Sequence, residues 1–226
     1  SAKIADITVA VSQSEVDHIT AVSGVELTTM VIPTIHEAVD GVPGFDDREG
    51  ILFVGGFQHD PNVDAATFLV REILPKVEKR IGTVPVTIVG SRATQEIHDL
   101  RSESVSVLGW VEDLHVVYAR HRYVVAPLRY GAGVKGKIGE ALSHGVPVVT
   151  TPIGIEGYEL RPGEDILIGS TADEIADLIV EVYKDREKWT TFSANGIRAV
   201  EKTAGLPALR EQLNRMLSLV KALRPK

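Results

Sequence analysis

Short apolar runs alternate with amphipathic segments along most of the chain, beginning at Ile51. The runs are mostly β-branched and have the length of buried strands, whereas the segments between them carry apolar residues at helical spacing. The pattern predicts six strands, over residues 51–54, 86–89, 105–108, 123–127, 146–150 and 166–168.

The segments between the strands predict helices, the first of which begins at Asp60 with Pro61 at its first helical position. Pro75 predicts a kink in this helix, whose buried stripe is expected to be Ala66, Leu69, Ile73 and Val77. Strands that alternate with helices form right-handed βαβ units. The sequence therefore predicts an α/β fold, with a parallel sheet covered by helices on both faces. Further helices are expected over 94–101, 112–120, 137–143, 171–182 and 186–203.

The two ends of the chain differ from this regular part. Strands are expected over 7–11 and 29–32, with a helix over 13–22 that Ser12 caps and Glu15 completes as a capping box. Residues 33–50 are rich in proline, glycine and acids and predict a linker. We therefore expect residues 1–48 to be the remnant of a preceding domain with its linker, residues 49–205 to form the α/β domain, and residues 206–226 to form an amphipathic helix. The apolar face of that helix would comprise Leu209, Leu213, Met216, Leu217 and Val220.

Charge and composition narrow the classes of function. The formal net charge is −7 and the pI about 5.5, so no nucleic-acid partner is expected. The chain has no cysteine, which excludes disulfides and thiolate metal sites and fits the cytoplasm. No apolar run is long enough to span a membrane. We expect a cytoplasmic protein, acting in solution or at the inner face of the membrane.

Residues 123–151 read as a strand, a glycine-rich loop, a short helix and a second strand. A loop of small residues that opens a helix leaves backbone N–H groups free and directs the positive end of the helix dipole at a ligand. The sequence predicts a phosphate or diphosphate site here; the alternative is a plain turn that needs glycine for positive φ. The candidate binding residues are Arg129, Gly131, Gly133, Lys135, Gly136 and Lys137.

Two familiar phosphate motifs match this loop only in part. Residues 131–136 fit G-x-G-x-x-G, with Glu156 at the distance of a ribose-binding acid. We reject this dinucleotide motif, because the loop does not leave the strand directly and Glu156 lies well into the following loop. A P-loop is also rejected, because Ile138 stands where the metal ligand requires a hydroxyl.

Glu140 lies about one turn into the helix after this loop. Its carboxylate is placed either to offset the helix dipole or to accept hydrogen bonds from the vicinal hydroxyls of a ribose. Spacing alone does not choose between these roles.

The run GEALSHGVPVVTT, residues 139–151, resembles the EAMA-x-G-x-P-V-V motif of retaining glycosyltransferase family 4, also called group 1. Residues 51–62, 86–90, 107–111, 155–159 and 163–165 resemble other segments of that family in the same order. The resemblance covers roughly residues 51–217 and implies the C-terminal, donor-binding half of a two-domain GT-B fold, a Rossmann-like domain.

The resemblance also implies roles for particular residues. Glu140 corresponds to the second glutamate of the family's E-x7-E pair, expected on the donor ribose. Gly55 and Gly56 would allow the diphosphate to approach, and the 131–136 loop would face the phosphates or the sugar. The nucleotide base would lie against the largely backbone surface of Gly109, Trp110 and Val111.

This sequence departs from the family pattern at three positions. Ala132 replaces the first glutamate of the pair, and Gly56 and Pro61 stand near the positions of the family's Arg and Lys. Lys135 and Lys137 are therefore expected to supply the positive charge from the other side of the cleft.

The leading hypothesis is transfer of a hexose from a nucleoside diphosphate sugar to a sugar or glycolipid acceptor, which the missing N-terminal domain would hold. We expect no cofactor and no metal, and we assign no catalytic residue; His59 is expected to be a solvated loop histidine. The alternatives are a non-catalytic nucleotide-binding or scaffold module, an NAD-dependent oxidoreductase, and a folded fragment without measurable ligand affinity.

Overall fold

The computed structural model describes residues 5–223 of the 226-residue chain. Residues 1–4 of the expected N-terminal remnant and 224–226 of the expected C-terminal helix lie outside this range. The centre of the fold is a six-stranded sheet in which all neighbouring strands are parallel, in the order β5-β4-β3-β6-β7-β8. The strands are β3 (Ile51–Val54), β4 (Val86–Val89), β5 (Val105–Gly109), β6 (Tyr123–Ala126), β7 (Val148–Thr150) and β8 (Leu167–Ile168).

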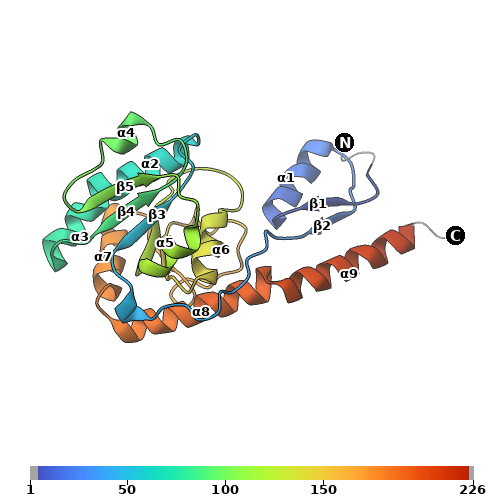
Figure 1. Cartoon of the computed structure of the whole chain (residues 1–226). Coiled ribbons are helices and arrows are strands. Elements are labelled where there is room, and N and C mark those ends of the chain that lie inside the picture. The colour runs from blue at the N-terminus through green and yellow to red at the C-terminus, as the bar shows by residue number, and fades with distance from the viewer. Residues whose placement is uncertain (1–4, 224–226) are drawn as a thin grey trace.

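Helices cover both faces of the sheet, which confirms the predicted α/β fold (Figure 1). Successive strand residues point to opposite faces, so Ile51 and Phe53 pack into one core cluster and Leu52 into the other. The first cluster includes buried residues of the helices over residues 60–81, 95–98 and 172–182, and the second includes residues of the helices over 114–120 and 136–143; the helix over 186–204 contributes its start to the first and its end to the second. The helices of this part are α2 (Asp60–Phe68), π-helix η3 (Leu69–Ile73), α3 (Leu74–Ile81), α4 (Gln95–His98), α5 (Leu114–Arg120), α6 (Gly136–Ser143), α7 (Ala172–Val182) and α8 (Arg186–Ala204).

The helix expected to kink at Pro75 contains a π-helical segment, η3, directly before that proline. Proline cannot donate a backbone hydrogen bond, and its ring clashes with the carbonyl four residues earlier. The irregularity predicted from Pro75 is therefore a π-helical turn between α2 and α3. Five expected strands are one or two residues shorter than predicted; among them, β7 begins only after Pro147 and β8 spans two residues.

The direction in which successive strands are added to the sheet reverses between β3 and β6. From β3 the sheet grows through β4 to β5 on one side, and then through β6, β7 and β8 on the other. In such doubly wound sheets the loops after two adjacent strands diverge, and they open a crevice beyond the strands' carboxyl ends. The fold therefore predicts a ligand site after Val54 and Ala126.

The N-terminal segment forms a small unit apart from the main sheet (Figure 1). β1 (Thr8–Ala10) and β2 (Thr29–Val31) pair in parallel, and α1 (Gln13–Ser23) joins them. The predicted Ser12 cap is confirmed, because Ser12 Oγ accepts from Glu15 N at 3.3 Å, but Glu15 Oε2 accepts from Val11 N (3.2 Å), one residue before the N–H that completes a capping box. α9 (Leu206–Leu223) continues from α8 and extends beside this unit (Figure 1).

The linker between the two parts is fastened to the α/β domain by Arg48 and a short 3-10 helix, η2 (Phe45–Asp47). The Arg48 side chain is 1% exposed and donates to the carbonyls of Pro43 (2.8 Å), Tyr118 (2.7 Å) and His144 (2.8 Å). Burial lowers the pKa of Arg48 to about 10. The guanidinium therefore joins the linker to the ends of α5 and α6.

Candidate donor-binding site

Gly55 and Gly56 follow β3, on one side of the crevice that the sheet topology predicts between β3 and β6. Gly55 N donates to Val89 O at 3.0 Å. A Cβ on Gly55 would lie 2.8 Å from Cγ of Asn62, and a Cβ on Gly90 would lie 1.7 Å from Gly55 O. Glycine is therefore needed here because neighbouring loops approach the backbone closely.

The opposite side is the loop from β6 to α6. Gly131 has φ 121° and Gly133 has φ 80°, values that favour glycine. The loop delivers the chain to the start of α6, where the N–H groups of Gly136 and Lys137 have no hydrogen-bond partner among the described residues. The structure therefore brings the predicted loop glycines and a helix N-terminus to the switch point of the sheet.

Lys135 is held by its own loop. Its ammonium donates to the carbonyls of Gly131 (3.3 Å) and Gly133, and lies 3.0 Å from Glu156 Oε2. The Lys135 side chain is 9% exposed. The charge of Lys135 is thus compensated within the protein, and Glu156 is engaged by this lysine.

Lys137 has different surroundings. Its ammonium donates to Asn62 Oδ1 and lies 5.0 Å from the centre of the Phe53 ring. None of the ion pairs within residues 5–223 includes Lys137. Burial, followed by the like charge of Lys135, lowers the pKa of Lys137 to about 8. A desolvated ammonium without a carboxylate is a suitable partner for an anionic ligand.

Arg129 lies at the start of the same loop but turns toward α2. Its guanidinium donates to both carboxylate oxygens of Asp64 and lies 4.0 Å from Glu72 Oε1. Asp64 raises the pKa of Arg129. Like Lys135, Arg129 has its charge compensated by carboxylates of the chain.

Glu140 is half-buried one turn into α6. The hydroxyl of Tyr118 lies 3.4 Å from Glu140 Oε2, at the limit of a hydrogen bond. Burial raises the pKa of Glu140, against the smaller opposing effects of Tyr118 and His115. The carboxylate has no cationic partner within 4.0 Å among the described residues and retains free acceptor capacity for ligand hydroxyls.

Two histidines that are far apart in the sequence meet beside Glu140. His144 Nδ1 donates to the Glu140 carbonyl (2.7 Å), because a carbonyl can only accept. Burial lowers the pKa of His144, so its Nε2 is unprotonated and accepts from His115 Nδ1 at 2.6 Å. This chain of hydrogen bonds fixes His115 at the start of α5.

The expected base pocket lies at the end of β5. Gly109 has φ 74° and its carbonyl accepts from Gly90 N at 2.8 Å. The Trp110 side chain is 71% exposed, and Val111 packs in part against the second core cluster. This segment therefore offers a ligand backbone groups and an exposed indole ring.

His59 is the N-cap residue of α2, and its side chain makes no capping hydrogen bond.

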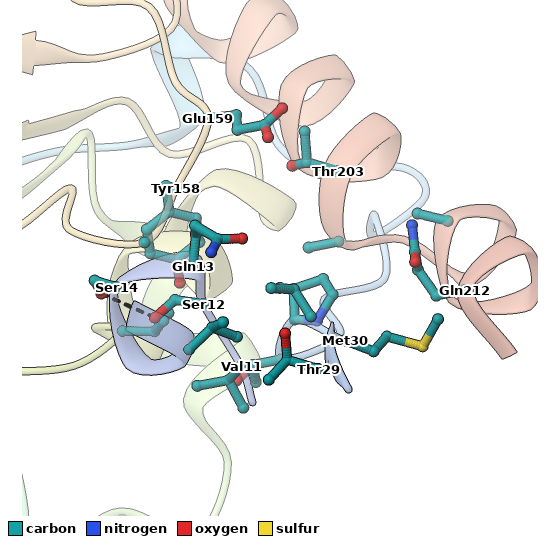
Figure 2. A pocket seen from close by; sticks show the side chains of 18 of the residues that line it. Val11, Ser12, Gln13, Ser14, Thr29, Met30, Tyr158, Glu159, Thr203 and Gln212 are labelled. Carbon is teal, nitrogen blue, oxygen red and sulfur yellow. Dashed lines mark hydrogen bonds between the residues drawn. The ribbon is translucent and has the colours of Figure 1, made fainter. Parts of the chain in front are cut away.

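A cavity of about 650 Å³ lies between the N-terminal unit, the loop around Tyr158 and the α8–α9 junction (Figure 2). Polar side chains, both charged and uncharged, line it together with apolar ones, and Ser12 and Ser14 hydrogen bond to each other at 3.0 Å (Figure 2). Tyr158 connects the cavity to the glycine loop, since its hydroxyl donates to Lys135 O (3.2 Å) and accepts from Gly139 N (3.2 Å). The labelled polar residues in the wall are Ser12, Gln13, Ser14, Thr29, Tyr158, Glu159, Thr203 and Gln212.

Sequence reasoning missed four residues of this region: Asn62, Tyr118, Tyr158 and the ion-pair role of Glu156. Each acts through a contact between segments at least 19 positions apart, and no local sequence pattern predicts such a contact.

No group of three or more His, Asp or Glu side chains in the described chain is arranged to hold a metal ion. None of the helices within residues 5–223 is long and apolar enough to cross a membrane.

Comparisons with known proteins identify the family of the chain and its fold. Residues 48–185 match the sequence model of the family described as "Glycosyl transferases group 1". An uncharacterized 44.6 kDa protein in the cps region of Klebsiella pneumoniae is 26% identical over 161 residues, which are 67% of this chain and 42% of that protein.

Solved structures show the same fold at low identity. HepE from Anabaena, in complex with UDP and glucose, has a TM-score of 0.74 and 18% identity over 96% of this chain and 64% of that one. TarM from S. aureus has a TM-score of 0.73 and 17% identity over 96% of this chain and 44% of that one. The chain therefore has the architecture of a GT-B Rossmann-like domain, and it spans less than two thirds of the length of these proteins.

Proposed function

The chain belongs to the group 1 glycosyl transferases, and from this premise we propose that it binds a nucleoside diphosphate sugar as the donor half of a retaining hexose transferase. The observation that carries the proposal is the cation at the switch point. Lys137 and the N–H groups at the start of α6 lie at the switch point, and no carboxylate within residues 5–223 forms an ion pair with this lysine.

Each part of the site has a role in this proposal. Lys137 and the α6 N-terminus bind the diphosphate and stabilise the negative charge that develops as the glycosidic bond breaks. Glu140 accepts hydrogen bonds from the ribose hydroxyls. Gly109, Trp110 and Val111 receive the base, and Gly55 and Gly56 allow the diphosphate to come close. The proposed chemistry needs no cofactor and no metal.

The acceptor, a sugar or glycolipid, is proposed to lie on the side of the cavity in Figure 2. Serine, threonine and glutamine side chains can hydrogen bond to the hydroxyl groups of a sugar. Tyr158, which lines the cavity, also donates to Lys135 O in the loop before α6. A two-stranded parallel sheet such as β1–β2 is normally part of a larger covered sheet. We therefore propose that a further domain completes the acceptor site and that the present chain alone transfers little or no sugar. We also propose that the reaction is cytoplasmic.

A thermal unfolding series tests the proposed function. A ligand that binds only the folded state raises the Tm by mass action. The account predicts a larger rise with one of UDP, GDP and ADP, or its sugar conjugate, than with the corresponding monophosphate. A rise with NADH and with none of the nucleoside diphosphates would contradict it. The alternative is a non-catalytic module, which the exposed Ala132 in place of the family's first glutamate supports. This alternative would be favoured if one of these diphosphates raises the Tm but no sugar is transferred, even when the chain is joined to its further domain.

A further inference from the structure

Asn62 joins the loop after β3 to the start of α6. Its Nδ2 donates to Gly56 O at 2.8 Å, and its backbone N donates to His59 O at 2.9 Å. Its Oδ1 accepts from Nζ of Lys137, which is 75 positions away in the sequence. Both partners fix the orientation of the amide, because an ammonium only donates and a carbonyl only accepts.

The Lys137 ammonium has no other polar side-chain partner among the described residues. The Phe53 ring lies at 5.0 Å from the ammonium, and the neighbouring charge on Lys135 repels it. A lysine side chain has about 2 kcal/mol of rotamer entropy, so a free ammonium would sample many positions. The Asn62 oxygen restricts the ammonium to the space beyond the carboxyl end of β3.

The chemistry of this partner matters as much as its position. A carboxylate at residue 62 would form an ion pair with Lys137 and neutralise the charge that a phosphate needs. An amide orients the ammonium and leaves its full charge available. Lys135 and Arg129 show the contrasting arrangement, because each is paired with a carboxylate.

We propose that Asn62 is a positioning residue for diphosphate binding. Its amide oxygen holds the Lys137 ammonium at the predicted crevice without neutralising its charge. The proposal rests on the proposed function, since it concerns the same site. The proposal predicts which variant loses more nucleotide affinity. Asn62→Asp should weaken binding more than Asn62→Ala does, although aspartate is closer in size and shape to asparagine. A merely structural asparagine would not produce this order.

Calorimetric titration of the full chain with UDP, GDP and ADP tests the proposal. The variants are Asn62→Asp, Asn62→Ala, Lys137→Met and the double variant Asn62→Ala/Lys137→Met, with exposed Asn214→Ala on α9 as the matched control. We expect a loss of about tenfold or more for Asn62→Asp, a smaller loss for Asn62→Ala and none for the control. The double variant should bind as Lys137→Met does, because Asn62 acts through that lysine. Wild-type affinity in Asn62→Ala, or additive losses in the double variant, would overturn the proposal.

A second measurement reports on the contact without a ligand. The pKa of Lys137, measured by NMR of its side chain, should rise in Asn62→Asp because the new carboxylate stabilises the ammonium. An unchanged pKa would overturn the contact itself. If wild-type protein binds no nucleotide while this pKa rises, the proposed function fails together with the role of Asn62 in affinity, although the contact stands. If Asn62→Asp does not fold, the comparison of Asn62→Ala with the double variant decides.

Discussion

Glu156 Oε2 lies 3.0 Å from Nζ of Lys135, whereas Lys137, two residues later in the chain, meets an amide and an aromatic ring. Two lysines of one loop thus have opposite surroundings. Lys135 fastens the loop to residue 156 and to the loop carbonyls. Lys137 keeps a positive charge that no carboxylate within residues 5–223 compensates.

The two lysines should respond differently to methionine substitution. Lys135→Met should lower the free energy of unfolding by about 1–3 kcal/mol, because it leaves carbonyls and a carboxylate without their donor. Lys137→Met should leave it unchanged or raise it, because a desolvated lone charge is removed. Urea denaturation measures both changes. Equal losses in the two variants would show that Lys137 is structural.

Nucleotide affinity should fall as the pH rises through about 8, the pKa of Lys137 in the free protein. A bound diphosphate stabilises the ammonium and raises this pKa, so binding takes up a proton wherever the free lysine is neutral. Affinity is therefore constant just below this pH and decreases above it by up to about tenfold per pH unit. Titrations between pH 6.5 and 9.5 measure the profile, and the decrease should be absent in Lys137→Met. A decrease that persists in this variant would assign the effect to another group.

Glu140→Gln should weaken binding of the ribonucleotide by about tenfold, because an amide replaces a charged acceptor of hydroxyl hydrogen bonds. The 2′-deoxy form of the same nucleotide should lose less, since it has one ribose hydroxyl fewer. Burial raises the pKa of Glu140. Wild-type affinity should consequently decrease at acid pH before an ordinary glutamate would protonate. Equal losses for both nucleotides would remove the ribose role from this residue.

Gly55→Ala should reproduce the effect of Asn62→Ala. The added Cβ would lie 2.8 Å from Cγ of Asn62 and must displace that side chain, and Lys137 with it. Gly44→Ala is the matched control, because its Cβ would meet only Asp47 Oδ2 at 3.9 Å. Nucleotide titration of both variants checks this prediction. Undiminished binding by a folded Gly55→Ala protein would show that the position of Asn62 does not matter.

The sequence predicted the fold because the fold depends on periodicity. Residues such as Ile51, Leu52 and Phe53 are apolar in succession because both faces of the sheet are covered. The linker shows where this reasoning fails. Residues 33–50 have the composition of a loop, yet Arg48 within them is 1% exposed and binds carbonyls up to 96 positions away. Composition predicts the exposure of an average residue in a segment. It does not predict a single buried side chain, such as Arg48, that is held by tertiary contacts.

The sequence predicted the location of the site better than the contacts of its charged side chains. Glycines with positive φ and the start of α6 follow from the sequence of the 131–136 loop. The charges of Arg129, Lys135 and Lys137 were expected to act together, and the structure separates them, because Asp64 and Glu156 reach two of the three. These carboxylates come from α2 and from the loop after β7, so their contacts depend on packing between distant segments.

Calorimetric titration with UDP, GDP and ADP, and with their common sugar conjugates, on wild type and Glu140→Ala tests the central claim most directly. The account predicts that one nucleoside diphosphate binds and that the substitution weakens this binding. Binding of none of them by the folded chain, and by the same chain joined to its further domain, would contradict a donor-binding site at the β3–β6 switch point.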